Sequence, residues 1–268
     1  MAGPRVTRAR KKERKDELMR HERILRELKV AWAIATKDMK IYYLKTASLM
    51  FGILFPFAMF LSFVVGRDMP ISRAIPVLVA QTVFFAASSI GPVSIPMERR
   101  LQTFDRFLSA PVSLLTVLLG KTIAGLAYGV GISFIPVAIG VAIFSTQITD
   151  LAGLTVGVVL SAFGFAAMGI MFASLPAQGP GQVMMPLNFV RIPLLFISGV
   201  YVAVKDLPSW AQIASAASPL THTIELIRLG LGGENFFGPA VNIAVLTVYL
   251  IAFLLAGMRF HIMNQKRE

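Results

Sequence analysis

The chain has 268 residues, of which 56% are hydrophobic and 15% are charged. A soluble domain has about 25% charged residues, so this composition excludes an ordinary water-facing globule. Apolar runs of roughly 20 residues, enough to cross a hydrocarbon core about 30 Å thick, recur along most of the sequence. The lack of cysteine excludes disulfides, thiolate nucleophiles and thiolate metal ligands. We therefore predict an integral membrane protein.

The net charge of +12 is concentrated near the N-terminus. The residues before Thr46 hold 14 of the 26 Lys and Arg residues and 6 of the 14 acidic residues, so this segment alone carries +8. A basic segment beside a membrane helix lies close to anionic lipid, where each basic residue gains about 1 kcal/mol. We assign this charge to membrane lipid and predict no nucleic acid partner. Residues 1–21 have too few apolar side chains to form a core, and we predict a basic, partly disordered cytoplasmic tail.

The sequence becomes amphipathic over residues 22–45. Apolar side chains, among them Trp32 and Tyr42, fall on one helical face, and basic side chains such as Lys37 and Lys40 fall on the other. We predict an interfacial helix whose apolar face lies along the inner leaflet, with the aromatic rings at headgroup depth. The same periodicity also fits a helix that packs on a soluble partner.

Six apolar segments follow. Backbone groups in lipid must form hydrogen bonds within their own segment, and these segments lack the alternation of barrel strands, so each is predicted to be a helix. The fold class is all-α, an integral membrane bundle. The second span contains Pro76 and Pro92, which predict kinks, and Pro96 is expected to end it. The predicted spans cover residues 46–65, 74–95, 118–144, 151–173, 183–204 and 241–258.

The distribution of basic residues predicts the orientation. With the N-terminus inside, the inner segments hold the basic tail and the Arg99–Arg106 region, and the positive-inside rule is satisfied. We therefore expect a multi-pass protein of the cytoplasmic membrane with both termini in the cytoplasm. Residues 261–268 form a cytoplasmic C-terminal stub. The outer loops hold few basic residues: Arg67, Arg73, Lys205 and Arg228.

The inner loop between the second and third spans, residues 97–111, reads MERRLQTFDRFLSAP. Its apolar residues are spaced as one face of a short amphipathic helix, with charged residues around it. Such a helix is a candidate docking surface for a cytoplasmic partner, although the same pattern also fits a helix that lies at the lipid interface. The candidate coupling residues are Glu98, Arg99, Arg100, Leu101, Phe104, Asp105 and Arg106.

The connection between the fifth and sixth spans, residues 206–239, is long and contains many apolar residues. This pattern predicts two short re-entrant helices, half inserted from the outer side, which could cap a path through the bundle. The alternative is a surface hairpin without such a role. The candidate residues of these outer helices are Trp210, Pro219, Glu225 and Arg228.

At these two segments the sequence resembles the permease subunits of type-2 ATP-binding-cassette (ABC) exporters. The matching stretches are ERRLQTFDRFLSAPVS and LLFISGVYVAVKDLPSWAQIASAASPLTHTIELIRLGL. Gln102 stands where that family usually has Gly, and Ser218 stands where it has Asn. The resemblance covers nearly all of the chain after residue 20 and implies that residues 46–260 form a six-helix type-2 ABC transmembrane domain.

The resemblance also implies partners. Two copies, or one copy and a related permease, would form the dimeric translocation unit. Each would bind a separate cytoplasmic ATPase through the inner-loop helix, and ATP and Mg²⁺ would bind to that ATPase rather than to this chain.

A P-loop requires Gly, four residues and then Gly-Lys-Ser/Thr, so that backbone amides can bind phosphates. The chain contains Gly120-Lys121-Thr122, but Leu115 occupies the position of the first Gly. We therefore predict a transport subunit that is not itself an enzyme, and we expect the Lys121 amine to reach lipid headgroups. Neither a bound cofactor nor a metal site is predicted, because no Cys or acidic residue stands at ligand spacing from the three histidines.

Arg191 is a cation inside the fifth predicted span, where its insertion costs about 3 kcal/mol. It either contacts an anionic cargo or extends to the interface from a span that begins later. The other cargo-path candidates, Gln81, Phe85 and Ser88, lie on the second span, where polar residues also serve helix packing.

These features favour an exporter permease that moves a lipophilic or amphipathic cargo by alternating access. The cargo class is inferred from spans rich in Phe and Leu with few polar groups. The alternative from another class is a membrane enzyme or scaffold that does not transport.

Overall fold

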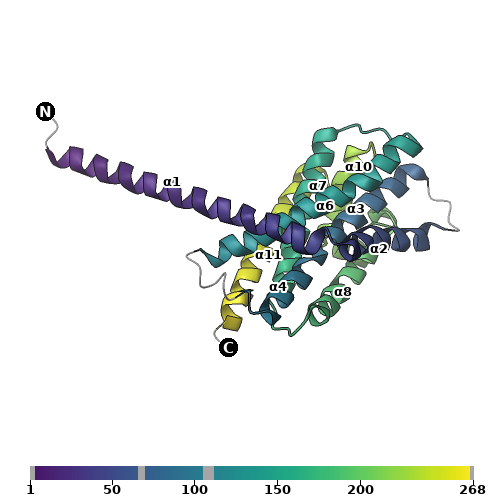
Figure 1. Ribbon diagram of the computed structural model, residues 1–268. Helices are drawn as coiled ribbons and strands as arrows, with labels where there is room; N and C mark the ends of the chain where they lie inside the picture. Colours follow the sequence, from purple (N-terminus) through teal and green to yellow (C-terminus); the bar gives the residue numbers. More distant parts are fainter. Residues whose placement is uncertain (1–3, 66–69, 105–111, 266–268) are drawn as a thin grey trace.

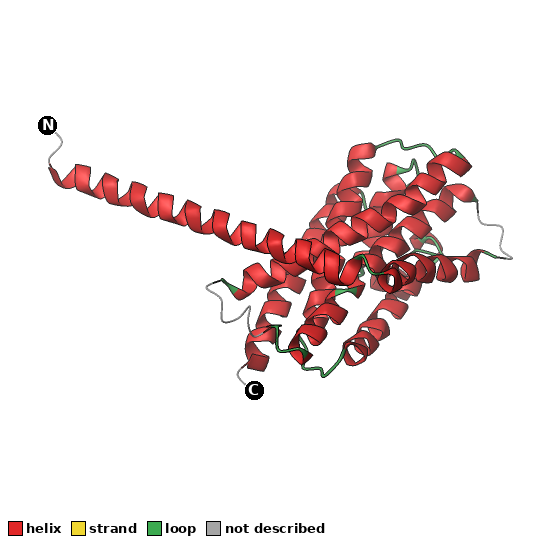
Figure 2. Ribbon diagram, in the orientation of Figure 1, coloured by secondary structure: helices red, strands yellow, loops and turns green. Residues whose placement is uncertain are grey.

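The computed structural model describes residues 4–65, 70–104 and 112–265. Every regular element in these ranges is a helix, so the all-α prediction is confirmed for them (Figure 2). The helices form a bundle from which one long helix, α1, projects (Figure 1). In chain order they are α1 (Pro4–Asp38), the π-helix η1 (Met39–Tyr43), α2 (Thr46–Val64), α3 (Ile71–Ser89), α4 (Gly91–Arg100), α6 (Leu114–Phe144), α7 (Leu151–Ala173), α8 (Pro180–Ile197), the 3₁₀ helix η2 (Val204–Asp206), α9 (Ser209–Ala216), α10 (Pro219–Gly230) and α11 (Pro239–Gln265).

Within the described residues, four helical stretches are long and apolar enough to cross a membrane. They are Ile71–Arg100, which comprises α3 and α4, Leu114–Phe144, Leu151–Ala173 and Pro239–Asn264. These correspond to the second, third, fourth and sixth predicted spans. The first and fifth predicted spans fold as the helices α2 and α8. The 18 residues of α8 include an arginine and three prolines, and the helix ends at Ile197 rather than near residue 204.

The proline-rich second span is broken in one place. Helix α3 ends at Ser89 and α4 begins at Gly91, so Pro92 falls in the first turn of a helix, where its missing N–H costs nothing. The prediction that Pro96 ends the span is wrong, because α4 continues to Arg100. Pro96 removes one backbone hydrogen bond from the helix. The packing of α4 against α7 and α8 compensates for this loss.

The N-terminal segment differs from its prediction in secondary structure. One helix, α1, runs from Pro4 to Asp38, with no boundary at residue 22. The segment is rich in Arg, Lys, Glu and Leu, which have high helix propensity, and an Arg23–Glu27 ion pair at i, i+4 adds a little support. Figure 1 shows that most of α1 stands away from the bundle and that its C-terminal part lies against it. There Ala31, Ile34 and Ala35 are buried in contact with α6.

Helix α3 lies at the centre of the bundle, where it packs against α2, α6, α7 and α10. Every residue from Ala74 to Ser89 is buried. Edge-to-face contacts among Phe84, Phe85 and Phe165 fill the interior. The bundle has two ends. The C-terminal end holds the ends of α4 and α11, and the distal end holds α9, α10 and the start of α11.

Candidate functional site

Four charged side chains form a closed ring at the C-terminal end, where α1, α4 and α6 meet. Lys37 and Asp38 end α1, Glu98 lies in the last turn of α4, and Lys121 lies near the start of α6. The Lys121 amine is 2.9 Å from Asp38 Oδ2 and 2.7 Å from Glu98 Oε2. The Lys37 amine is 2.7 Å from Asp38 Oδ1 and also pairs with Glu98 Oε1. The ring therefore ties together three helices that are distant in sequence.

The ring is buried and its charges balance. The side chains of Asp38, Glu98 and Lys121 are 1–2% exposed, and that of Lys37 is 30% exposed. Partial burial opposes the charge on Lys37, but Asp38 and Glu98 outweigh it and raise the pKa of this amine. The prediction that Lys121 reaches lipid headgroups is wrong, because its amine turns inward to the two carboxylates. Loss of one member would leave a buried charge without compensation.

A glycine allows α1 to approach α6 closely enough for the ring to form. A Cβ atom on Gly120 would lie 2.7 Å from the carbonyl oxygen of Ala31 and 2.9 Å from Cβ of Ile34. Farther out, Thr116 donates a hydrogen bond of 3.2 Å to Glu27. Gly120 and Lys121, which resemble part of a P-loop, thus serve a helix contact.

The inner loop begins with a tight helix end. The N–H of Thr103 donates to the carbonyl of Glu98, and the N–H of Gln102 donates to that of Arg99, both at 2.9 Å. This pair of bonds is the Schellman motif, which places its penultimate residue in the left-handed region. Gln102 has φ of 53°, so the turn that Gly favours forms here with Gln.

Arg99, the residue after Glu98, connects α4 to the opposite side of the bundle. The Arg99 guanidinium donates to the carbonyl of Leu175, after α7, and lies 3.0 Å from Nδ1 of His261 on α11. Phe104 is 2% exposed and makes an edge-to-face contact with the His261 ring. Close to this contact, Asn264 donates to the carbonyl of Ser174. Adjacent residues of α4 therefore connect to α1 and α6 on one side and to α7 and α11 on the other.

The predicted coupling residues divide into two groups. Glu98 and Phe104 face the protein interior, whereas Arg100 and Leu101 are exposed on the turn. Asp105 and Arg106 lie outside the described residues. Of the predicted interfacial residues outside the ring, Trp32 and Lys40 are exposed and Tyr42 is half-buried.

The candidate cargo-path residues are all buried in the bundle. Gln81 accepts a hydrogen bond of 3.0 Å from Tyr201, and Ser88 donates to the carbonyl of Phe84. Arg191 is fully buried, so it does not extend to the surface of the described chain. Its Nη1 lies 3.4 Å from Ser89 Oγ and 3.5 Å from Asn188 Oδ1, and its guanidinium stacks 5.5 Å from the centre of the Phe85 ring. Within the described residues its partners are these neutral groups, and no carboxylate forms an ion pair with it.

The distal end has its own polar network on α10, which is buried against α3, α7 and α11. Glu225 accepts from the backbone N–H groups of Phe236 and Phe237, and its other oxygen lies 3.6 Å from Arg228. Arg228 also donates to the carbonyl of Gly199 at 2.6 Å. In contrast, Trp210 on α9 is 69% exposed, and Pro219 starts α10 inside the bundle.

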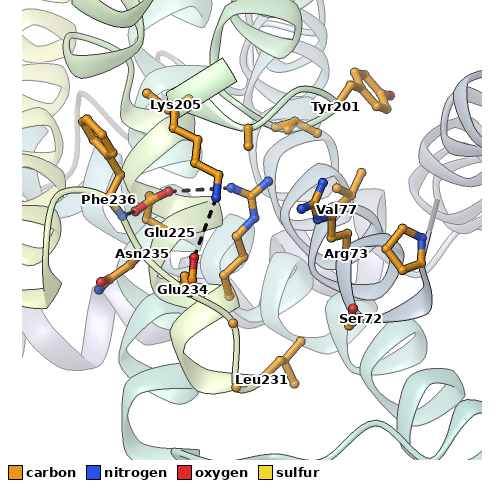
Figure 3. Close-up of a pocket in the computed structure, with 17 residues that line it drawn as sticks. Ser72, Arg73, Val77, Tyr201, Lys205, Glu225, Leu231, Glu234, Asn235 and Phe236 are labelled. Carbon is orange, nitrogen blue, oxygen red and sulfur yellow. Dashed lines mark hydrogen bonds and ion pairs between the residues drawn. The ribbon is translucent and has the colours of Figure 1, made fainter. Parts of the chain in front are cut away.

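A cavity of about 790 Å³ opens beside this network. Its walls are the start of α3, the segment that follows α8, and α10 with the loop after it (Figure 3). Three cationic side chains, those of Arg73, Lys205 and Arg228, line it together with the carboxylates of Glu225 and Glu234. Across the described residues, no group of three His, Asp or Glu side chains is placed to hold a metal ion.

Sequence reasoning missed Asp38 and the linking roles of Lys121 and His261. Asp38 belongs to the predicted interfacial helix, but its partner Lys121 is 83 residues away. Arg99 and His261 are 162 residues apart. A lone acidic residue at the end of a basic helix and a lysine inside an apolar run are the available local signals, and neither identifies its partner.

The family model for the ABC-2 type transporter matches residues 28–231, which is most of the chain. The chain belongs to this family. It is a permease domain of an ABC transporter, a membrane transport subunit, and its 268 residues contain no P-loop sequence. The predicted resemblance is therefore confirmed, and the ring, the Schellman turn and the distal network are features of an ABC-2 permease.

The similar proteins include two named as transport permeases and one named as a nodulation protein. The inner membrane transport permease YadH of Escherichia coli K12 is 25% identical over 154 residues, 58% of this chain and 60% of YadH. Nodulation protein J of Rhizobium leguminosarum bv. trifolii is 28% identical over 155 residues, 56% of this chain and 57% of that protein. The probable multidrug ABC transporter permease YbhR of E. coli K12 is 21% identical over 155 residues, 58% of this chain and 42% of YbhR. The matches thus span about 60% or less of these relatives.

Proposed function

We propose that this chain is the transmembrane subunit of an ATP-driven exporter that moves a lipophilic or amphipathic molecule across the cytoplasmic membrane. A separate ATPase subunit supplies the energy, and the bundle alternates between inward and outward access. Nucleotide drives this change through its different affinity for the two states. The observation that carries the proposal is the buried ring of Lys37, Asp38, Glu98 and Lys121, because it joins the interfacial helix to both helices that flank the inner loop.

The ring gives the inner loop a rigid base. Helix α4 enters the loop after Glu98 and α6 leaves it before Lys121, so a force on the exposed turn at Arg100 and Leu101 reaches three helices at once. Arg99 extends this connection to α7 and α11. We assign the docking of the ATPase to the exposed turn and the transmission of movement to the buried ring.

In the proposed arrangement the protein has six transmembrane helices, with α2 and α8 as the first and fifth. Both termini and the C-terminal end of the bundle face the cytoplasm. Helices α9 and α10 are re-entrant from the outer side, which is supported by the exposed apolar side chains Trp210 and Ile213 on α9. Two permease chains form the unit, and the exposed apolar side chains Met185 and Phe189 on α8 are the proposed contact between them.

The cargo path is proposed to follow the buried row on α3 that contains Gln81, Phe85 and Ser88, and to pass Arg191. Arg191 and its neutral neighbours would provide a contact for an anionic group when the bundle opens. Two relatives carry names that refer to multidrug transport and to nodulation.

Co-purification with an ATPase tests the proposal most directly. Tagged protein extracted in mild detergent should recover a P-loop ATPase subunit, identified by mass spectrometry. The pair in liposomes should move a fluorescent phospholipid analogue when ATP is added, and a lysine-to-alanine change in the P-loop of the ATPase should abolish movement. Failure to recover any P-loop subunit would reject the proposal.

Variants on the exposed turn sharpen this test. Arg100→Glu and Leu101→Asp should each reduce recovery of the ATPase, because both side chains are exposed on the turn and available to a partner. Trp210→Ala, an exposed change at the distal end, is the matched control and should leave recovery unchanged. Equal recovery in all three variants would contradict docking at this turn.

A further inference from the structure

The distal cavity has the size and lining of a ligand site. Pockets that hold small molecules have volumes of about 300–1,000 Å³ and combine apolar walls with a few placed polar groups. This cavity, of about 790 Å³, has Val77, Tyr201, Leu231 and Phe236 among its apolar lining residues. Figure 3 shows Arg73 and Ser72 on one wall and Lys205, Glu225 and Glu234 across from them.

The charges of the cavity do not balance. Three cations face two carboxylates, so the lining has an excess of one positive charge. Glu225 is fully engaged, since one oxygen pairs with Arg228 and the other accepts from the backbone of Phe236 and Phe237. Its negative charge is therefore used to hold α10 and the loop after it.

The remaining cations are available to a ligand. Lys205 and Glu234 are 3.8 Å apart, with side chains 58% and 95% exposed, which is a weak surface pair. Arg73 is exposed, and no carboxylate of the described residues forms an ion pair with it. Burial lowers the pKa of Arg228, Glu225 opposes this change, and the positive charge of Arg73 adds to it. An anion in the cavity would provide a partner for Arg73 and a stronger one for Lys205.

We propose that this cavity binds the anionic group of an amphipathic molecule, such as a phosphate or carboxylate with an apolar tail. Arg73 and Lys205 contact the anion, and Val77, Tyr201 and Phe236 contact the start of the tail. Tyr201 also donates to Gln81, one turn deeper than Val77 on α3, which connects this wall of the cavity to the bundle interior. This proposal goes beyond the exporter function, since binding requires neither ATP nor a partner ATPase.

Binding of a soluble probe tests the site. Purified protein in nanodiscs of pure phosphatidylcholine is titrated with dihexanoyl phosphatidic acid, and dihexanoyl phosphatidylcholine, which has the same tails, is the ligand control. Arg73→Gln should raise the dissociation constant about tenfold or more, because a hydrogen bond to a charged group is lost. Arg73→Lys should restore part of the affinity. Lys45→Gln, which removes an exposed cation away from the cavity, should have no effect.

A variant with the opposite expected sign separates binding from stability. Glu234→Gln removes an exposed carboxylate beside Lys205 and should lower the dissociation constant by about 1.5- to 5-fold, the range expected for a weak surface pair. A folding defect cannot produce tighter binding. The proposal is overturned if both ligands bind equally, or if Arg73→Gln and Glu234→Gln leave the affinity unchanged.

The source of the ligand is settled by a second membrane composition. In nanodiscs that contain phosphatidylglycerol, native mass spectrometry should show a retained anionic lipid that Arg73→Gln loses, if the ligand is a bilayer lipid. If the soluble probe binds but no lipid is retained, the ligand is a molecule that arrives from solution or through the transporter. Both results support an anion site. If Arg73→Gln still binds the soluble probe and still retains the lipid, the anion site is rejected.

Discussion

The two ends of the bundle differ in how their charged side chains are paired and buried. At the C-terminal end, two lysines and two carboxylates form a closed ring in which three members are almost fully buried. At the distal end, three cations and two carboxylates surround an open cavity, and the Lys205–Glu234 pair is exposed. A balanced buried network holds helices together, because each charge has a partner and breaking one leaves another alone. An unbalanced exposed cluster contributes little to stability and has charge left for a ligand.

The largest expected effect comes from breaking the ring. Glu98→Gln would leave Lys37 and Lys121 to share Asp38, and we expect the free energy of unfolding in detergent micelles to fall by about 3–5 kcal/mol. The double variant Glu98→Gln/Lys37→Met keeps the buried Asp38–Lys121 pair and restores neutrality. Its loss should be clearly smaller than the sum of the single losses. Additive losses would show that the four groups do not act as a ring.

The approach of α1 to α6 can be tested with one methyl group. Gly120→Ala places Cβ 2.7 Å from the carbonyl of Ala31, and we expect a loss of about 1–3 kcal/mol in the free energy of unfolding, as for an overpacked core. Gly131→Ala is the matched control in the same helix, because nothing lies within 4 Å of its Cβ. That change should be neutral or stabilising, since Ala is the better helix former. Equal behaviour of the two variants would contradict a tight contact at Gly120.

In the turn that starts the inner loop, Gly should stabilise the protein at Gln102 and destabilise it at the preceding Leu101. Gln102→Gly removes the cost of a positive φ, and we expect a gain of about 0.5–1 kcal/mol after allowance for the entropy of Gly. The adjacent Leu101 has φ of −87°, so Leu101→Gly should instead lower the free energy of unfolding. The same sign of change at both positions would argue against the Schellman turn.

The smallest expected effect on stability comes from a change at the distal end. Glu234→Gln breaks the exposed pair with Lys205, and we expect a change of less than about 1 kcal/mol in the free energy of unfolding. Added salt should leave the effect of Glu98→Gln in place, because buried pairs are screened much less than exposed ones. A loss for Glu234→Gln as large as that for Glu98→Gln would remove the distinction between the two ends.

The fold was predicted from sequence where one segment carries the whole signal. The third and fourth spans follow from long apolar runs, and their helices begin or end within a few residues of the predicted limits. The limits of the fifth span were harder to predict from sequence. Its helix α8 contains Arg191 and three prolines, and its position depends on packing. The end of the second span was misplaced at Pro96, since a proline in a buried helix is tolerated when neighbouring helices support it.

The candidate site was predicted in part. The inner loop was identified from its charge and periodicity. Periodicity put Leu101 and Phe104 on one helical face, whereas α4 ends at Arg100, before both of them, and Leu101 is exposed while Phe104 is buried. Glu98 was assigned to docking and instead points inward to α1 and α6. Local spacing predicts which residues share a helix face, and it does not predict where that helix ends or what covers it.

The sequence by itself determined that this is an all-helical ABC-2 permease and where its main apolar helices lie, because length, composition and local motifs are properties of single segments. Only the tertiary structure decided that Lys121 joins Asp38 and Glu98, that Arg191 is buried among neutral groups, and that Arg73 and Lys205 share a cavity. These pairings join residues up to 132 positions apart, the separation of Arg73 and Lys205, and a charge in sequence carries no information about its partner until the chain has folded.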